Sequence, residues 1–340
     1  MKSLLYNRYN PFPLMLPLKT AINLTGERLI LVVYHLVCDE IPDHIRHLYL
    51  PRSLKTFSDD MTCLMRYYEP VDLLSLKDMV INHEKPKKNL FFISFDDGLE
   101  EFFSMAAPVL TKMGIPATCF LNTAFIDNND MFYRYKVSVL IETIQKHKEN
   151  PQFWKSFHKL KEDFNIPPGY YRHVLLDLGH THIPFIHAAA KLVDLDFSDY
   201  LKKKQPYLTS EKIRELIGKG FTFGGHGIDH TEFSTLDDEG KIKQAIQSTR
   251  EVSKRFDLSY RVFAFPFTDF GIRKSFFDAI YDRDQVELSF GTAGLKHDSE
   301  YRNLQRIPIE DFNLSAERRL KTDYFYYLLK GIVGKNTIRR

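Results

Sequence analysis

The sequence predicts an α/β fold in which parallel strands alternate with helices. Residues 28–35 and 90–95 are continuous apolar runs, which are typical of strands buried on both faces of a parallel sheet. Residues 99–113 repeat apolar side chains at helical spacing, end at Gly114, and lead into a further apolar run at 117–121. Strand, helix and strand in this order form a βαβ unit, and 340 residues are enough for a large core.

The sequence also predicts the boundaries of the domain that contains this alternating region. Residues 1–28 are predicted to be an N-terminal extension packed on the outside, 29–310 the main domain, and 311–340 a C-terminal helix and basic tail. Residues 130–205 break the rhythm with helical patterns, which predicts an inserted subdomain or lid. Strands are expected at 220–225, 261–265, 288–290 and 304–309, and helices at 53–83, 209–219 (opened by a Thr209 cap), 236–256 and 274–281.

Composition describes an ordinary globular protein, with 44% apolar and 27% charged residues. A net charge of +3 is too small to indicate nucleic acid as a partner. The three cysteines are scattered, so they imply neither a disulfide framework nor a metal site. The first residues lack the apolar segment of a secretory signal, and we therefore expect a cytoplasmic protein.

The C-terminal region offers two interpretations. Residues 324–333 form an amphipathic pattern, and Lys335, Arg339 and Arg340 follow it. A basic amphipathic helix can contact an anionic membrane surface, but such a helix more often packs on its own domain. Peripheral membrane contact therefore stays an expectation. Oligomeric state has no signal in the sequence.

Chemistry-bearing side chains follow two of the predicted strands. Asp96, Asp97 and Gly98 come directly after the strand at 90–95, and His226 and His230 come after the glycine-rich end of the strand at 220–225. Two neighbouring carboxylates resist joint ionisation, and a cation that neutralises one of them relieves that cost. HxxxH spacing places two imidazoles on one side of a helical turn or tight loop.

One carboxylate and two imidazoles make a three-ligand catalytic metal site with open positions. The set favours one divalent metal, zinc first, and it also suits cobalt, nickel or iron. One acid would bind the metal, and the other would stay free to accept a proton from water, which suits amide or ester hydrolysis. Each motif alone is better explained by a turn or by surface histidines. Their joint placement at strand ends favours the metal site.

These segments resemble the motifs of the polysaccharide deacetylases, carbohydrate esterase family four. Ser94-Phe95-Asp96-Asp97-Gly98 resembles the first family motif, residues 225–230 the second, and Phe263-Ala264-Phe265-Pro266-Phe267 the third, which forms a wall of the groove. Residues 291–294 and 306–308 are similar to segments of a branch that begins with Tyr-His, here Tyr34-His35. The resemblance spans about residues 29–309 with the insertion set aside.

The resemblance implies a distorted (β/α) barrel of about seven strands that removes acetyl groups from N-acetylated, or less often O-acetylated, sugars. Asp96 would be the general base, and Asp97, His226 and His230 would hold the metal. The groove would be lined by residues at two strand ends: Tyr34, His35, Phe265, Pro266 and Phe267.

Two departures from the family pattern concern the catalytic partners. The third motif often carries an arginine that orients the base, but Ala264 stands there, so Arg261 or Arg306 is expected to substitute. The late histidine that serves as general acid is absent, which leaves His297, His35 or solvent to protonate the leaving group. These gaps keep a second hypothesis open, in which the protein is a non-catalytic glycan-binding relative that retains its metal site.

Overall fold

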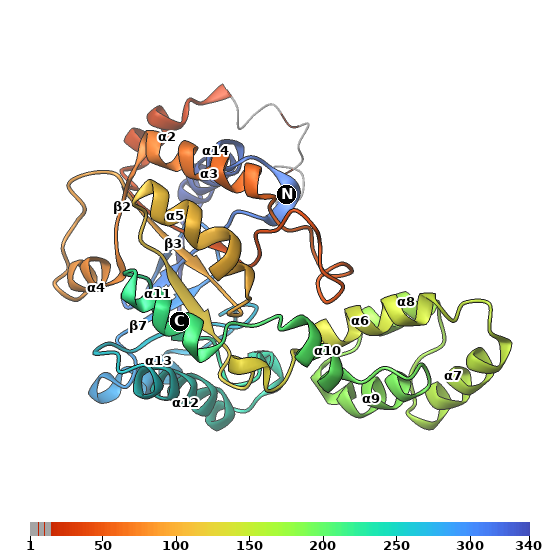
Figure 1. The fold of residues 1–340 in the computed structure, drawn as a ribbon. Coiled ribbons are helices and arrows are strands. Elements are labelled where there is room, and N and C mark those ends of the chain that lie inside the picture. The colour runs from red at the N-terminus through yellow and green to blue at the C-terminus, as the bar shows by residue number, and fades with distance from the viewer. Residues whose placement is uncertain (1–5, 7–9, 11–14) are drawn as a thin grey trace.

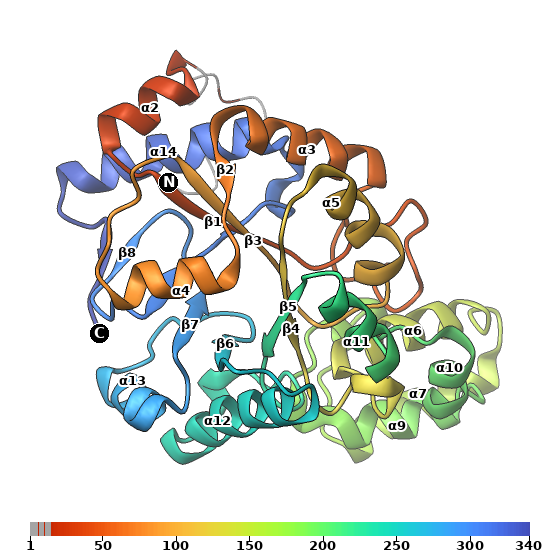
Figure 2. The same ribbon diagram turned by 60° about the vertical axis from the view of Figure 1, so that its left-hand side comes forward.

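The computed structural model describes Tyr6, Asn10 and residues 15–340, so the first half of the predicted N-terminal extension 1–28 lies mostly outside the described residues. A sheet of parallel strands forms the centre, and helices surround it (Figure 1; Figure 2). The strands, in spatial order, are β10 (Ile307–Pro308), β1 (Leu29–Tyr34), β3 (Leu90–Phe95), β4 (Thr118–Leu121), β5 (Thr222–Gly225), β6 (Val262–Ala264), β7 (Leu288–Gly291) and β9 (Asn303–Gln305). The short β2 (Glu69–Pro70) also pairs with β3.

The segment 303–308 brings this sheet nearly to closure. β9 pairs with β7, through Gly291 and Gln305, whereas β10 pairs with β1, through Val32 and Ile307. Arg306 is the single residue between β9 and β10, so the two form one interrupted strand. This strand pairs with β7 at one edge of the sheet and with β1 at the other. Counted in this way the barrel has seven parallel strands, which confirms the predicted fold class.

Helices cover the outside of the barrel (Figure 2). They begin and end as their local sequence requires: Thr209 Oγ1 accepts a hydrogen bond from Lys212 N–H, and Gly114 ends its helix with φ +65°. A π-helical turn, Phe102–Ala106, precedes that helix. The covering helices are α2 (Leu18–Thr25), α3 (Leu54–Tyr67), α4 (Leu73–Ile81), α5 (Ala107–Met113), α11 (Ser210–Gly218), α12 (Asp238–Arg255), α13 (Lys274–Tyr281) and α14 (Ala316–Ile332).

Five further helices project from one side of the barrel (Figure 1). We call this part of the chain the helical arm; it consists of α6 (Tyr133–Gln145), α7 (Pro151–Asp163), α8 (Tyr171–Leu176), α9 (Ile183–Lys191) and α10 (Phe197–Lys204). The arm has an apolar core of its own, which includes Leu140, Phe157 and Phe185. Leu36 and Ile45, from the loop after β1, belong to the same cluster and tie the arm to the carboxyl end of that strand.

The C-terminal region packs on the barrel. α14 is longer than the predicted helix at 324–333 and lies against α2 and α3. After it, β11 (Thr337–Ile338) pairs with β8 (His297–Asp298). The Arg340 guanidinium, 3% exposed, forms ion pairs with Asp269 and Asp298, so this part of the predicted basic tail does not face solvent. Within the described residues, no helix has the length and apolar character needed to cross a membrane.

Candidate metal centre

A sharp turn after β3 presents two neighbouring carboxylates to one cavity. Asp96 N–H continues the sheet by donating to Tyr34 O at 3.0 Å, and Asp97 then adopts φ +72°. Gly98 follows with φ +67°, and a Cβ at this position would lie 2.7 Å from Leu121 Cδ2. Only glycine fits here without strain, which explains the order of residues in the first motif.

Asp97, His226 and His230 converge, and their ligand atoms all lie within 4.8 Å of one another. His226 follows β5, and its Nδ1 lies 2.9 Å from Ala264 O, which fixes Nδ1 as the donor and turns Nε2 toward Asp97. Asp97 Oδ1 is 3.5 Å from His226 Nε2 and 3.2 Å from His230 Nε2. His230 has φ +57°, so the HxxxH pair lies on a tight loop rather than on a helical turn.

The donor atoms of this cluster fit a divalent cation. Among the described residues, Asp97 Oδ1 is a buried acceptor without a hydrogen-bond partner, although it faces both imidazoles. Burial alone would raise the pKa of Asp97, but the neighbouring His230, His226 and His35 hold it well below its usual value. One carboxylate oxygen and two imidazole nitrogens are the ligands that zinc and related metals take in catalytic sites.

Tyr135, which the sequence did not indicate, supports this cluster from the helical arm. It lies in the first turn of α6, and its hydroxyl donates to Asp97 Oδ2 at 2.5 Å. Both oxygens of Asp97 are thus oriented, Oδ2 by Tyr135 and Oδ1 toward the histidines. The predicted insertion therefore contributes directly to the site.

Arg306 holds the second carboxylate. Its Nη1 donates to Asp96 Oδ1 at 2.7 Å, its Nη2 to Asp96 Oδ2 at 2.9 Å, and both side chains are at most 2% exposed. Burial would raise the pKa of Asp96, but the charge of Arg306 keeps it below its usual value. Asp96 Oδ2 is 3.9 Å from His226 Nε2. Of the two arginines expected to substitute for the family arginine, Arg306 contacts Asp96.

His35 and Glu310 form a second pair at the same end of the barrel. Glu310 Oε2 lies 3.0 Å from His35 Nδ1 and accepts the His35 N–H at 3.0 Å, while Oε1 accepts the Leu36 N–H at 3.1 Å. Burial lowers the pKa of His35, but the hydrogen bond and charge of Glu310, together with Asp97 and Asp96, raise it to about 10. The carboxylate thus orients the imidazole and favours its protonated form.

These side chains open onto a cavity of about 290 Å³, which we call the carboxyl-end cavity. It is small enough to take one sugar ring at a time. Aromatic and aliphatic side chains make most of its wall. The lining residues are Val33, His35, Leu48, Tyr49, Asp96, Asp97, Phe132, Arg134, Tyr135, His226, His230, Phe265, Phe267, Thr292 and Pro308.

Two residues predicted to line the groove do not lie on the cavity. Tyr34 is fully buried in the core, where its hydroxyl donates to Asp60 Oδ2 at 3.2 Å. It is the last residue of β1, and its side chain points away from the face that His35 occupies. Pro266 is buried behind the wall formed by Phe265 and Phe267. Phe265 and Phe267 therefore line the cavity as predicted, whereas Tyr34 and Pro266 do not.

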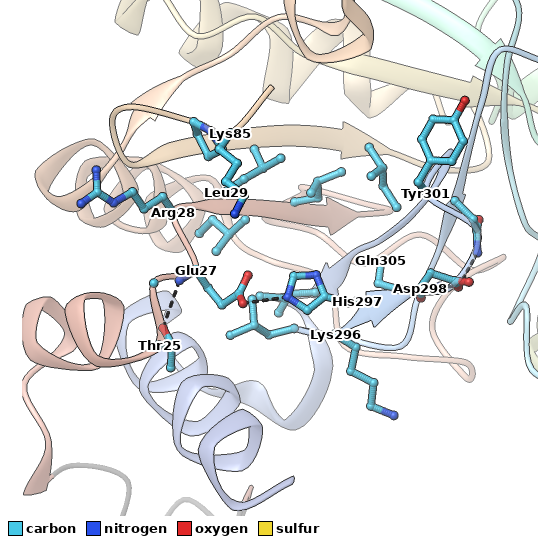
Figure 3. A pocket seen from close by; sticks show the side chains of 18 residues that line it. Thr25, Glu27, Arg28, Leu29, Lys85, Lys296, His297, Asp298, Tyr301 and Gln305 are labelled. Carbon is cyan, nitrogen blue, oxygen red and sulfur yellow. Dashed lines mark hydrogen bonds and ion pairs between the residues drawn. The ribbon is translucent and has the colours of Figure 1, made fainter. Parts of the chain in front are cut away.

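His297, predicted as a general acid, lies at the opposite end of the barrel. Figure 3 shows it in a separate cavity at the amino ends of β1 and β9, where its Nε2 is 2.8 Å from Glu27 Oε1. It shares this cavity with Glu27, which precedes β1, and with Asn303 at the start of β9, so it lies at the wrong end for chemistry with Asp96. The assignment of His297 to the site is therefore corrected.

The fold and the cluster define a parallel-stranded barrel with an Asp-His-His site at the carboxyl ends of its strands. The family model described as "Polysaccharide deacetylase" matches residues 83–275. The chain therefore belongs to the polysaccharide deacetylase family. The matched range contains Asp96, Asp97, His226 and His230, whereas His35, Arg306 and Glu310 lie outside it. No curated protein matches the chain.

Solved structures with the same fold are similar over most of their length. The Streptococcus pyogenes deacetylase PplD in complex with acetate has 15% identity and a TM-score of 0.56, covering 86% of this chain and 97% of that one. IcaB from Ammonifex degensii has 16% identity and a TM-score of 0.53, covering 87% and 98%. A de-N-acetylase from Aggregatibacter actinomycetemcomitans has 12% identity and a TM-score of 0.52, covering 86% and 99%.

Proposed function

We propose that this protein is a metal-dependent hydrolase that removes the acetyl group from an N-acetylated sugar of a glycan or glycan precursor. An O-acetylated sugar is the less favoured substrate. The observation that carries the proposal is the convergence of one ligand atom each from Asp97, His226 and His230 within 4.8 Å, next to a carboxylate that Arg306 holds in place. Membership of the polysaccharide deacetylase family supports the sugar as substrate.

Asp97, His226 and His230 would hold one divalent cation, with zinc favoured by the two imidazoles and single carboxylate. Such a cation acts as a Lewis acid toward the acyl oxygen and makes water a better nucleophile near neutral pH. Tyr135 and the Ala264 carbonyl orient two of the three ligands, which limits the rearrangement needed when a cation binds.

Asp96 would be the general base. Its carboxylate lies beside the ligand cluster, 3.9 Å from His226 Nε2, and is therefore placed to accept a proton from an attacking water. The two hydrogen bonds from Arg306 fix the plane of the carboxylate, so that little orientational freedom remains to be lost during the reaction.

His35 would protonate the leaving nitrogen in place of His297. An amine is a poor leaving group unless it is protonated as the C–N bond breaks, so a positioned acid is needed. Glu310 binds Nδ1 and leaves Nε2 of His35 to face the cavity, and 34% of the His35 side chain is exposed there. A proton lost from Nε2 can thus be replaced from solvent after each turnover.

Acetate release from a panel of N- and O-acetylated sugars, with and without chelator, tests the proposed function. We expect release that stops with chelator and returns with zinc, and about one zinc per chain. Asp97→Ala should lose both metal and turnover, whereas Asp96→Asn should keep the metal and lose turnover. Full turnover by Asp96→Asn would contradict the role of the base. Metal binding without acetate release from any sugar would favour the glycan-binding relative.

The role of His35 is tested by comparing leaving groups. His35→Ala should lower kcat for an N-acetyl sugar by about 10²–10⁴-fold, and much less for an activated aryl acetate, whose leaving group needs no proton. Glu310→Gln should show the same pattern in weaker form, because the imidazole remains. His297→Gln is the matched control and should retain activity. An equal loss on both substrates would show that His35 has another role.

A further inference from the structure

Arg134 is a positive charge on the wall of the carboxyl-end cavity that no carboxylate neutralises within the described part of the chain. Its Nε is buried and, in the same part of the chain, has no hydrogen-bond partner. The guanidinium lies 5.5 Å from the centre of the Phe267 ring, and the hydroxyl of the neighbouring Tyr133 donates to Glu232 Oε1 at 3.2 Å. Arg134 is therefore held in place with a free donor.

The acids that line or adjoin this cavity already have partners. Asp96 accepts both hydrogen bonds from Arg306, Asp97 faces the two histidines, and Glu310 binds His35. Glu232 accepts a hydrogen bond from Tyr133, and within the described part of the chain no ion pair joins any of these four carboxylates to Arg134. Arg134 is half-buried, and partial removal of a guanidinium from water without a counter-ion costs free energy that a ligand supplying an anion recovers.

The start of α6 favours an anion at the same place. Phe132, Arg134 and Tyr135 all lie in or next to the first turn of this 13-residue helix, and its N-cap residue makes no side-chain cap. The unpaired N–H groups of a first turn carry a partial positive charge that adds to the charge of an arginine beside them. The N-terminus of α6 and the guanidinium of Arg134 thus both favour an anion in the cavity.

Arg134 is also close to the reacting centre. The next residue, Tyr135, donates to Asp97, and the Phe267 ring under the guanidinium is 4.6 Å, centre to centre, from the imidazole of His230. A cavity of about 290 Å³ leaves room for one sugar ring between these groups. An anion that reaches Arg134 must then be attached to the sugar that carries the acetyl group.

We propose that the substrate sugar carries an anionic group, a ring carboxylate or an anomeric phosphate, and that Arg134 binds it. The inference rests on the proposed function and adds the substrate class to it. The planar fork of arginine suits the paired oxygens of either group. If Arg134 is instead only a packing residue between Phe267 and Tyr133, its removal will not affect discrimination between charged and neutral sugars.

The test compares binding of N-acetylglucosamine, its 1-phosphate and N-acetylglucosaminuronic acid by calorimetry at about 0.15 M salt. Chelator-treated and zinc-loaded protein are both used, because zinc itself attracts phosphate. We expect the wild type to bind at least one acidic sugar about 10- to 100-fold more tightly than the neutral one. Arg134→Gln should bring this ratio to within about twofold of one, and Arg134→Lys should retain part of it.

Arg172→Gln is the matched control, because it removes one exposed charge from the same helical arm. It should leave the ratio unchanged, which separates contact from long-range electrostatics. A wild-type ratio near one, or a ratio that survives in Arg134→Gln, overturns the proposal. If N-acetylglucosaminuronic acid binds more tightly than the 1-phosphate, the anion is a carboxylate, and the reverse order identifies a phosphate. Retained discrimination without acetate release would refute the proposed function alone, and acetate release without discrimination would refute this inference alone.

Discussion

Removal of Arg306 is expected to destabilise the protein strongly, because it leaves a buried charge behind. Arg306 and Asp96 are 0% and 2% exposed, and two charge-assisted hydrogen bonds of 2.7 and 2.9 Å join them. Arg306→Met fills similar space without a charge, so the carboxylate of Asp96 stays buried and unpaired. Breaking one side of a buried ion pair costs about 3–5 kcal/mol.

The other contacts of Arg306 add little to this loss of stability. Its Nη1 also donates to Ser94 Oγ and its Nε to Gly291 O, but both partners keep a further hydrogen bond. The Ser94 hydroxyl donates to Val32 O, and Gly291 O accepts the backbone N–H of Arg306. Most of the loss therefore comes from Asp96, and a second substitution that removes the charge should restore stability.

Urea unfolding of chelator-treated protein, followed by circular dichroism, measures this effect without a contribution from metal. Arg306→Met and Asp96→Asn should each lower the free energy of unfolding, and the double variant should be about 2–3 kcal/mol more stable than the sum of the two losses predicts. Arg66→Met, on an exposed face of α3, is the control and should change stability by less than about 0.5 kcal/mol. A loss below about 1 kcal/mol in Arg306→Met, or additive losses, would refute the reasoning.

Three further predictions concern Tyr135, Arg340 and His297. Tyr135→Phe removes the hydrogen bond to Asp97 Oδ2 and should weaken zinc binding about 10-fold in a chelator competition, with an unchanged circular dichroism spectrum; equal affinity would count against support from the arm. Arg340→Ala leaves Asp269 and Asp298 buried and should cost about 3–5 kcal/mol in urea unfolding, and a loss within experimental error would show that the ion pairs contribute little. The hydrogen bond to Glu27 raises the pKa of His297 above 6.5, so its stabilising contribution is complete below pH 6.5 and disappears as pH rises through the raised value. The stability difference between wild type and His297→Gln should accordingly shrink as pH rises above 6.5, and a constant difference would contradict this.

Local sequence patterns were sufficient to predict the alternation of strands and helices, and the family resemblance added the barrel. Apolar runs and helical spacing identified the strands that became β1, β3 and β4, together with the helix ended by Gly114. Parallel strands place all their carboxyl ends at one edge, so residues directly after β3 and β5 were expected at the same end of the fold. The structure shows that Asp96, Asp97, His226 and His230 line one cavity there.

Tyr135 and Arg134 could not be predicted in the same way. They belong to the arm, and their place in the cavity depends on how α6 packs against the barrel and on which of its faces turns inward. Helical periodicity separates a buried face from an exposed one, but it does not say which buried residues meet an active site. Arg306 was named only as one of two substitutes, because its contact with Asp96 requires the register of the closing strand.

The wrong assignment of His297 shows what the order of the strands predicts and what it leaves open. A residue that precedes a barrel strand lies at its amino end, and a residue that follows the strand lies at its carboxyl end. His297 precedes the closing segment 303–308, whereas Glu310 comes directly after it and His35 directly after β1. His297 also follows β7, which ends at Gly291, so the rule leaves its place undecided, whereas it selects His35 and Glu310, which come directly after strands. A proton donor should therefore be sought first among residues directly after strands.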